Sequence, residues 1–138
     1  MGMLGAGCMD CVPLLQELIG RELADWRGYQ ALARRTGGAP ARSIAALAGS
    51  KKRRARRLSA ACFLISGVKY WPEKGRTPAI SSYLGELRQR FMGEQETMAA
   101  YLAGAESTSD PCLRQLFWDH ARENWDHACQ IRTLVEQM

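Results

Sequence analysis

Glu22, Glu94 and His127 are the side chains whose types could do chemistry in this chain. Carboxylate oxygens and imidazole nitrogens donate lone pairs to metal ions, so these three residues could hold one zinc, manganese or iron ion. His120 or Asp25 could supply a further ligand. We therefore ask whether the chain brings these residues together, and what lies beside them.

A dense run of basic residues, KKRRARR at positions 51–57, complicates this metal hypothesis. The apolar pattern around the run repeats at alternating steps of three and four residues, which puts Lys51 and Arg54 on the same face as the core residues. Four other cations point to the flanks or outward: Lys52, Arg53, Arg56 and Arg57. No aromatic residue interleaves with the run, so we do not expect nucleic acid as a partner.

The segments that must position these residues read as four long helices. Turn signals at TGGAP, GVKYWPEKGRTP and ESTSDP divide the chain, and no segment alternates with period two. We predict helices at 13–35, 39–66, 77–105 and 110–137, and an all-α fold. The connection after the second helix has about ten residues and reaches roughly 33 Å when extended, so it is long enough either to cross the bundle, which would make the second and third helices parallel, or to join them as up-down neighbours.

Heptad spacing gives each predicted helix an inward stripe that is apolar at its ends and polar in its middle. The stripes are Leu15, Leu18, Glu22, Asp25, Tyr29 and Leu32; Ile44, Leu47, Lys51, Arg54, Leu58, Ala61 and Ile65; Ile80, Leu84, Leu87, Phe91, Glu94, Met98 and Tyr101; and Leu113, Phe117, His120, Asn124, His127, Ile131 and Leu134. Charged residues rarely occupy core positions unless they are paired or bound to a metal. The stripes predict a polar layer across the middle of a four-helix bundle.

Four features of this pattern resemble the ferritin-like proteins of the rubrerythrin type. Glu22 is followed seven residues later by Tyr29, and Glu94 by Tyr101. AGSKKRRARRL and ARENWDHACQI stand where that family has its two Glu-x-x-His helices. The resemblance spans residues 14–135 and implies a ferritin-like four-helix bundle. It also implies a di-metal centre that reduces peroxide or handles oxygen and iron, with Tyr29 and Tyr101 as relay partners.

The six ligand positions that the resemblance implies fall on Glu22, Lys51, Arg54, Glu94, Asn124 and His127. Lys51 stands in place of the first motif's Glu, Arg54 in place of its His, and Asn124 in place of the second motif's Glu. A protonated ammonium or guanidinium has no lone pair for a metal, and arginine stays protonated inside proteins. Two carboxylates facing two cations instead form a nearly neutral ion-pair layer.

Two functions of different class follow. The first is a non-catalytic structural or interaction protein that needs no cofactor, with Asp25, Tyr29 and Tyr101 surrounding the ion-pair layer. The second is a metal-dependent oxidoreductase that holds one iron, manganese or zinc ion on Glu22, Glu94 and His127, with help from His120. No G-x-S-x-G elbow, P-loop or dinucleotide-binding motif is present in the chain.

Length and composition set the remaining expectations. At 138 residues we expect one bundle domain, 13–138, preceded by a flexible segment, 1–12, in which Cys8 and Cys11 form a lone C-x-x-C motif. Five cysteines, an odd number, favour a reducing compartment, and we predict a cytoplasmic protein. No run approaches the length of a membrane span. We expect a homodimer.

Overall fold

The computed structural model describes residues 6–72 and 75–138, with only the backbone described for residues 6–8. A short 3-10 helix, η1 (Ala6–Cys11), leads into α1 (Val12–Ala33). Three more helices follow: α2 (Gly38–Ser66), α3 (Tyr83–Ser107) and α4 (Pro111–Glu136). The prediction of an all-α four-helix bundle is therefore confirmed. The predicted thiol pair of Cys8 and Cys11 falls partly outside the described residues, because the Cys8 side chain is not among them.

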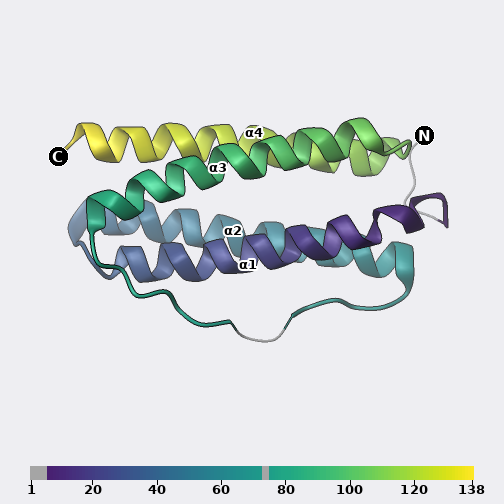
Figure 1. The fold of residues 1–138 in the computed structure, drawn as a ribbon, viewed down its shortest axis with the longest axis horizontal. Coiled ribbons are helices and arrows are strands. Elements are labelled where there is room, and N and C mark those ends of the chain that lie inside the picture. The colour runs from purple at the N-terminus through teal and green to yellow at the C-terminus, as the bar shows by residue number, and fades with distance from the viewer. Residues whose placement is uncertain (1–5, 73–74) are drawn as a thin grey trace.

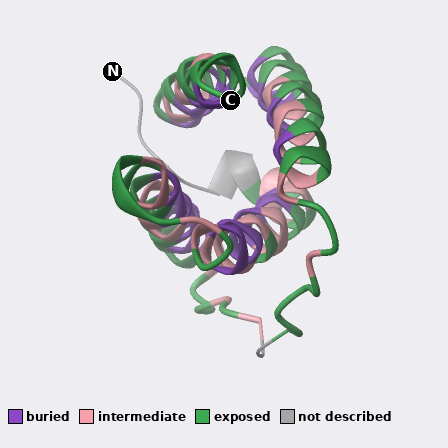
Figure 2. Ribbon diagram, turned by 90° about the vertical axis from the view of Figure 1, so that its left-hand side faces the viewer, coloured by how far each residue is buried: buried purple, intermediate pink, exposed green. Residues whose placement is uncertain are grey.

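The bundle consists of two antiparallel helix pairs, α1 with α2 and α3 with α4 (Figure 1). The connection from α2 to α3 runs back along the length of the bundle, so α2 and α3 are parallel (Figure 1). The end-on view shows the buried sides of all four helices facing a common interior (Figure 2). None of the helices in the described part of the chain combines the length and the apolar character needed to span a membrane.

Local sequence signals explain where the helices begin and end. The Asp110 side chain accepts a hydrogen bond from the Leu113 amide at 2.9 Å and caps α4, which starts at Pro111. The Ser82 side chain caps α3 in the same way through the Gly85 amide, at 3.0 Å. Gly67 ends α2 with φ of 77°, in the left-handed region that favours glycine.

The predicted start of α3 at residue 77 was wrong by six positions. Residues 75–80 are extended, because Pro78 disfavours helix at the residue before it and Ser82 supplies the N-cap. Ile80 therefore lies before the helix rather than on its inward stripe. Leu84, also predicted to point inward, is 50 % exposed, while Tyr83, four residues before the buried Leu87, packs against the core instead.

The apolar core forms two clusters at opposite ends of the bundle. One includes Leu18, Leu58, Tyr101 and Phe117. The other is built from Leu32, Ile44, Leu47, Leu87, Ile131 and Leu134. The polar residues of the middle of each helix lie between these two clusters, where the site described next is found.

Candidate functional site

The centre of the bundle holds two carboxylates and two cations that are almost completely shielded from solvent. Glu22 on α1 and Glu94 on α3 are 0 % and 2 % exposed, and Lys51 and Arg54 on α2 are both 0 % exposed. Their burial is costly unless each charge is paired and hydrogen-bonded. We call these four residues, together with Asn124 and His127 on α4, the ion-pair layer.

Lys51 is the centre of the carboxylate contacts. Its Nζ lies 3.0 Å from both Oε1 and Oε2 of Glu94, and 3.5 Å from Oε1 of Glu22. It also lies 3.4 Å from Oδ2 of Asp25, the partly exposed acid at the edge of the layer. The Lys51 ammonium thus forms ion pairs with three carboxylates, which come from two helices.

Arg54 engages Glu22 and links it to α4. Its Nε and Nη2 lie 3.0 and 2.9 Å from Oε2 of Glu22, and Nη2 donates a hydrogen bond to Oδ1 of Asn124 at 2.8 Å. Burial alone would lower the pKa of Arg54, but the negative charge of Glu22, together with smaller contributions from Tyr101 and Glu94, holds that pKa above its usual range. The guanidinium is therefore permanently charged.

Two buried tyrosines complete the hydrogen bonding of the carboxylates. The Tyr29 hydroxyl donates to Oε2 of Glu94 at 2.5 Å, and the Tyr101 hydroxyl donates to Oε2 of Glu22. Burial, followed by the charge of the neighbouring glutamate, raises the pKa of each tyrosine well above its usual value. Both hydroxyls therefore remain protonated donors.

Helix α4 contributes the remaining partners of Glu94. Asn124 donates through Nδ2 to Oε1 of Glu94 at 2.7 Å, while its Oδ1 accepts from Arg54. His127 lies with Nδ1 3.3 Å from the same Oε1 and with Nε2 3.1 Å from Oγ of Ser50. Burial would raise the pKa of Glu94, but the hydrogen bond with His127 and the charge of Lys51 hold it well below its usual value.

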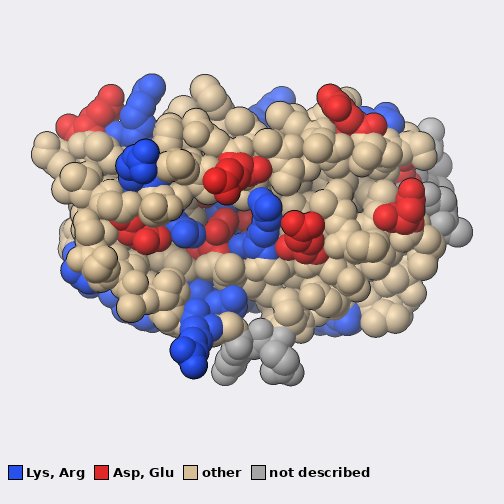
Figure 3. Space-filling view, viewed as in Figure 1, with Lys and Arg blue, Asp and Glu red and all other residues tan. Residues whose placement is uncertain are grey.

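Three residues of this network were missed by sequence reasoning: Ser50, Arg90 and Glu123. Arg90 pairs with Asp25 at 3.0 Å and with Glu86 at 2.9 Å, and Glu123 lies 3.8 Å from Nη1 of Arg54. All three lie beside the inward stripes rather than on them, so heptad spacing does not find them. Acidic and basic side chains intermix along the seam between α1 and α3, as the space-filling view shows (Figure 3).

His120 is the one predicted site residue that the layer does not engage. It is completely buried, lies edge-on to the Tyr101 ring at 5.0 Å, and neither ring nitrogen has a hydrogen-bond partner among the described residues. Burial, with the positive charges of Arg54 and Arg57, lowers its pKa to about 2. The imidazole is therefore neutral.

The capacity of this site for a metal depends on which lone pairs are free. Both oxygens of Glu94 accept hydrogen bonds, as does Oε2 of Glu22. Among the described residues, Oε1 of Glu22 has no hydrogen-bond partner and lies 3.5 Å from the Lys51 ammonium. Across residues 6–72 and 75–138, no cluster of three or more His, Cys, Asp or Glu side chains has a metal-binding arrangement. The carboxylate oxygens of Glu22 and Glu94, which a metal ion would need as ligands, are instead bound to Lys51 and Arg54.

We expect acid to destabilise the fold in two steps. His120 has a folded-state pKa of about 2, below its value of 6.5 in an unfolded chain, so its contribution is complete above pH 6.5 and is lost as the pH falls. The pKa of Glu94 is also lowered in the folded state, so the stability that Glu94 contributes is lost as the pH falls below about 4.5. The pKa of Asp25 is raised, so its protonation partly offsets both losses. Urea unfolding midpoints from pH 8 to pH 3 measure this profile.

A His120→Phe variant is the control for the first step. The phenyl ring retains the edge contact with Tyr101 and cannot titrate, so the slope between pH 6.5 and pH 5 should become shallower. An equal slope in the two proteins would show that His120 is not held neutral in the folded state.

Comparison with known proteins finds a solved structure with a similar fold. No protein-family model and no curated protein matches the chain. A hypothetical protein from Pyrococcus furiosus has a similar solved structure, with a TM-score of 0.81, 19 % sequence identity, and coverage of 97 % of this chain and 95 % of that chain. At this identity the likeness shows the fold alone. The chain is thus a four-helix bundle whose fold is shared, over 97 % of its length, with another protein of unestablished function.

Proposed function

We propose that this chain is a ferritin-like bundle of the rubrerythrin type that has exchanged its di-metal centre for an ion-pair network and serves as a non-catalytic, self-associating structural module. One observation carries the proposal. The Lys51 ammonium and the Arg54 guanidinium are fully buried between Glu22 and Glu94, within 3.0 Å of their oxygens. They occupy two of the six positions that hold ligands in an active member of that family.

The residues present do not fit a di-metal centre. Of the six positions only Glu22, Glu94 and His127 carry metal-binding side chains, and Asn124 is already bonded to both Arg54 and Glu94. A charged lysine or arginine offers no lone pair. The chemistry of the donor set therefore argues for a layer that is complete without a metal.

Electrostatics points in the same direction. A divalent ion placed 4 Å from Lys51 would meet a repulsion of about 8 kcal/mol at an effective dielectric of 20, twice the value for two unit charges. It would also have to break the hydrogen bonds that Glu94 accepts from Lys51, Asn124 and Tyr29. The protein cations already supply the compensation that a metal would provide.

The second candidate function, a metal-dependent oxidoreductase with one metal ion, is favoured by one feature. His120 is buried, and neither of its ring nitrogens has a hydrogen-bond partner in the part of the chain that the structure describes, as would be expected of an empty metal ligand. In this alternative Lys51 swings away, and one iron, manganese or zinc ion binds Glu22, Glu94 and His127 with help from His120. Such a site could support peroxide reduction or iron handling.

A thermal-shift experiment separates the two functions. Any ion that binds only the folded protein raises its melting temperature, by an amount equivalent to about 2.7 kcal/mol at a hundred times the dissociation constant. We expect the melting temperature to stay constant when EDTA, Mn²⁺, Zn²⁺ or anaerobic Fe²⁺ is added. A rise with one ion that disappears in a His127→Ala variant would favour the oxidoreductase.

The outer face of α3 and α4 supports the self-association part of the proposal. Trp118 and Trp125, two turns apart on α4, are 49 % and 60 % exposed, and Leu102 and Leu84 on α3 are also exposed. Large apolar side chains gathered on one face are typical of protein interaction sites. Grooves between the two helices run beside these indoles and beside Val135.

We propose a second copy of this chain as the occupant of this face. Trp118 and Trp125 lie seven residues apart, so both indoles are on the same side of α4. In an antiparallel, two-fold arrangement centred between them, Trp118 of each copy faces Trp125 of the other. This self-complementary apolar pattern suits an isologous dimer.

Sedimentation velocity tests this dimer. We expect a dimer for the natural protein and a monomer for Trp125→Glu, because the new charge would be buried against the second copy. Leu64→Glu, an equally exposed apolar position on α2, is the matched control and should remain dimeric. A natural protein that sediments as a monomer at several hundred micromolar would refute the self-association.

A further inference from the structure

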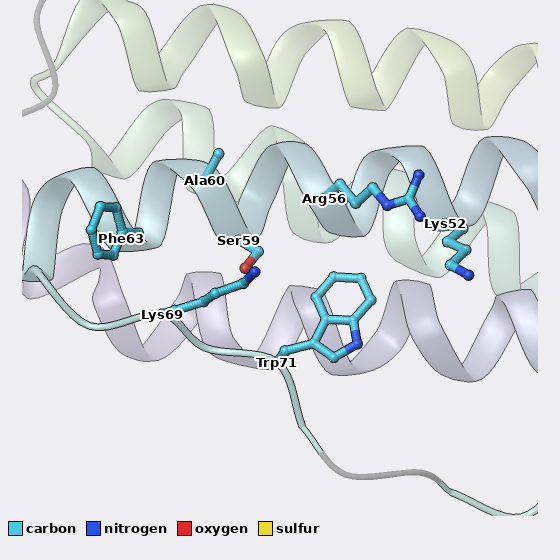
Figure 4. A pocket seen from close by; sticks show the side chains of 7 residues that line it. All are labelled: Lys52, Arg56, Ser59, Ala60, Phe63, Lys69 and Trp71. Atoms are coloured by element: carbon cyan, nitrogen blue, oxygen red, sulfur yellow. The ribbon is translucent and has the colours of Figure 1, made fainter.

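An open hollow of about 650 Å³ lies between α2 and the crossover connection, away from the ion-pair layer. Its α2 wall includes Lys52, Arg56 and Phe63, and its other wall is formed by Lys69 and Trp71 of the connection (Figure 4). A volume of this size is in the range of small-molecule sites, about 300–1,000 Å³. Fold topology alone brings these two stretches of chain together.

The hollow carries positive charge that no acidic residue among its described lining residues compensates. Lys52, Arg56 and Lys69 line it, and none of the described lining residues is acidic. Arg56 and Lys69 form no ion pair or hydrogen bond with a residue of the described ranges. This differs from Arg57, the next cation along α2, which pairs with Glu123 at 3.1 Å. Free cations that converge on a concave surface attract an anion, and an arginine fork suits phosphate.

An exposed aromatic ring lies beside these cations. Trp71 is 41 % exposed, and its indole extends from the connection toward α2, below Arg56 and Lys52 (Figure 4). No aromatic residue interrupts the basic run of α2 itself, so the crossover connection supplies the stacking surface that the run lacks. A planar ring stacked on an indole, with phosphate held by nearby cations, is how proteins often bind nucleotides.

The walls of the hollow are held in position. Ser59 on α2 donates a hydrogen bond to the Tyr70 carbonyl at 2.8 Å, and Tyr70 packs against the apolar core. Lys69 and Trp71 flank this anchored residue. On the α2 wall, the Lys52 ammonium is held by a cation–π contact, 4.4 Å from the centre of the Trp26 ring. A preformed site loses less free energy on binding than one that must be ordered.

We propose that this hollow binds a nucleotide, with the phosphates on Arg56, Lys52 and Lys69 and the base stacked on Trp71. The same chemistry is offered by a free nucleotide and by the end of a single-stranded nucleic acid. The limited volume of the hollow, about 650 Å³, favours the free nucleotide.

Isothermal titration calorimetry with ATP, AMP, inorganic triphosphate and a dT12 oligonucleotide tests the proposal. We expect ATP to bind, inorganic triphosphate to bind at least about fivefold more weakly because it cannot stack, and dT12 to bind no more tightly than ATP. Arg56→Glu should weaken ATP binding at least about tenfold, and Trp71→Ala about fivefold or more. Both side chains are at the surface, so both variants should fold.

Arg53→Glu is the matched control, because it makes the same charge change on the same helix outside the hollow. It should change ATP affinity less than about threefold. Absence of ATP binding at 1 mM, or an equal loss in Arg53→Glu and Arg56→Glu, would overturn the site. Much tighter binding of dT12 than of ATP would overturn the choice of a free nucleotide.

Discussion

Replacing Glu94 with alanine is expected to lower the free energy of unfolding by about 3–5 kcal/mol, the cost typical of breaking a buried ion pair from one side. Glu94 is 2 % exposed and accepts hydrogen bonds from Lys51, Asn124 and Tyr29. Its removal leaves the Lys51 ammonium fully buried with its shortest contacts gone. Urea denaturation followed by circular dichroism measures the loss.

Three further variants show that this loss comes from the stranded charge. Glu96→Ala, on an exposed position of the same helix, should change the free energy of unfolding by no more than about 0.5 kcal/mol. Adding Lys51→Met to Glu94→Gln should recover part of the loss seen in Glu94→Gln alone, because an uncharged pair needs no compensation. Equal midpoints for Glu94→Ala and Glu96→Ala would mean that the layer does not contribute to stability.

Converting the ion-pair layer into a ligand set is expected to create iron binding. Lys51→Glu, Arg54→His and Asn124→Glu together should raise the iron content from none to about two ferrous ions per chain, the stoichiometry of a ferritin-like di-metal centre. The three exchanges lower the formal charge of the layer by about four units when the introduced imidazole is neutral, which matches the charge of two divalent ions. Anaerobic titration with Fe²⁺ and elemental analysis measure the gain.

The same experiment needs a control for non-specific binding. Lys52→Glu with Arg53→His makes a similar exchange one residue away, outside the inward stripe, and should bind no iron tightly. The triple variant should be less stable than the natural protein without metal and should regain stability when iron is added, because its carboxylates then have a partner. A folded triple variant that takes up no iron would contradict the ferritin-like alignment of these positions.

Helical periodicity accounts for much of the layer. The steps of three and four residues on α2 place Lys51 and Arg54 on the inward face, and both are fully buried in the structure. The same reasoning placed Glu22 and Asn124 at matching depth on α1 and α4. Spacing works here because residues seven apart on a bundle helix face the same neighbours, whatever their chemical type.

Contacts that depend on side-chain reach or on the crossover could not be predicted this way. Arg90 comes from the flank of α3 to pair with Asp25, and it has no position in a heptad argument. Trp71 lines the same hollow as Arg56 only because the connection returns along α2. Leu84 and Ile80 were misplaced because the Ser82 cap, rather than the apolar pattern, determines where α3 starts.

The most direct test of the ion-pair layer is the metal content of the natural protein. The protein is purified without chelator or affinity metal, loaded anaerobically with ferrous and manganous ions, desalted and analysed for bound metal. We predict less than about 0.1 metal ion per chain, because Lys51 and Arg54 already neutralise Glu22 and Glu94. One or two ions per chain, lost in Glu94→Ala, would contradict the account and show that the cations yield their place to a metal.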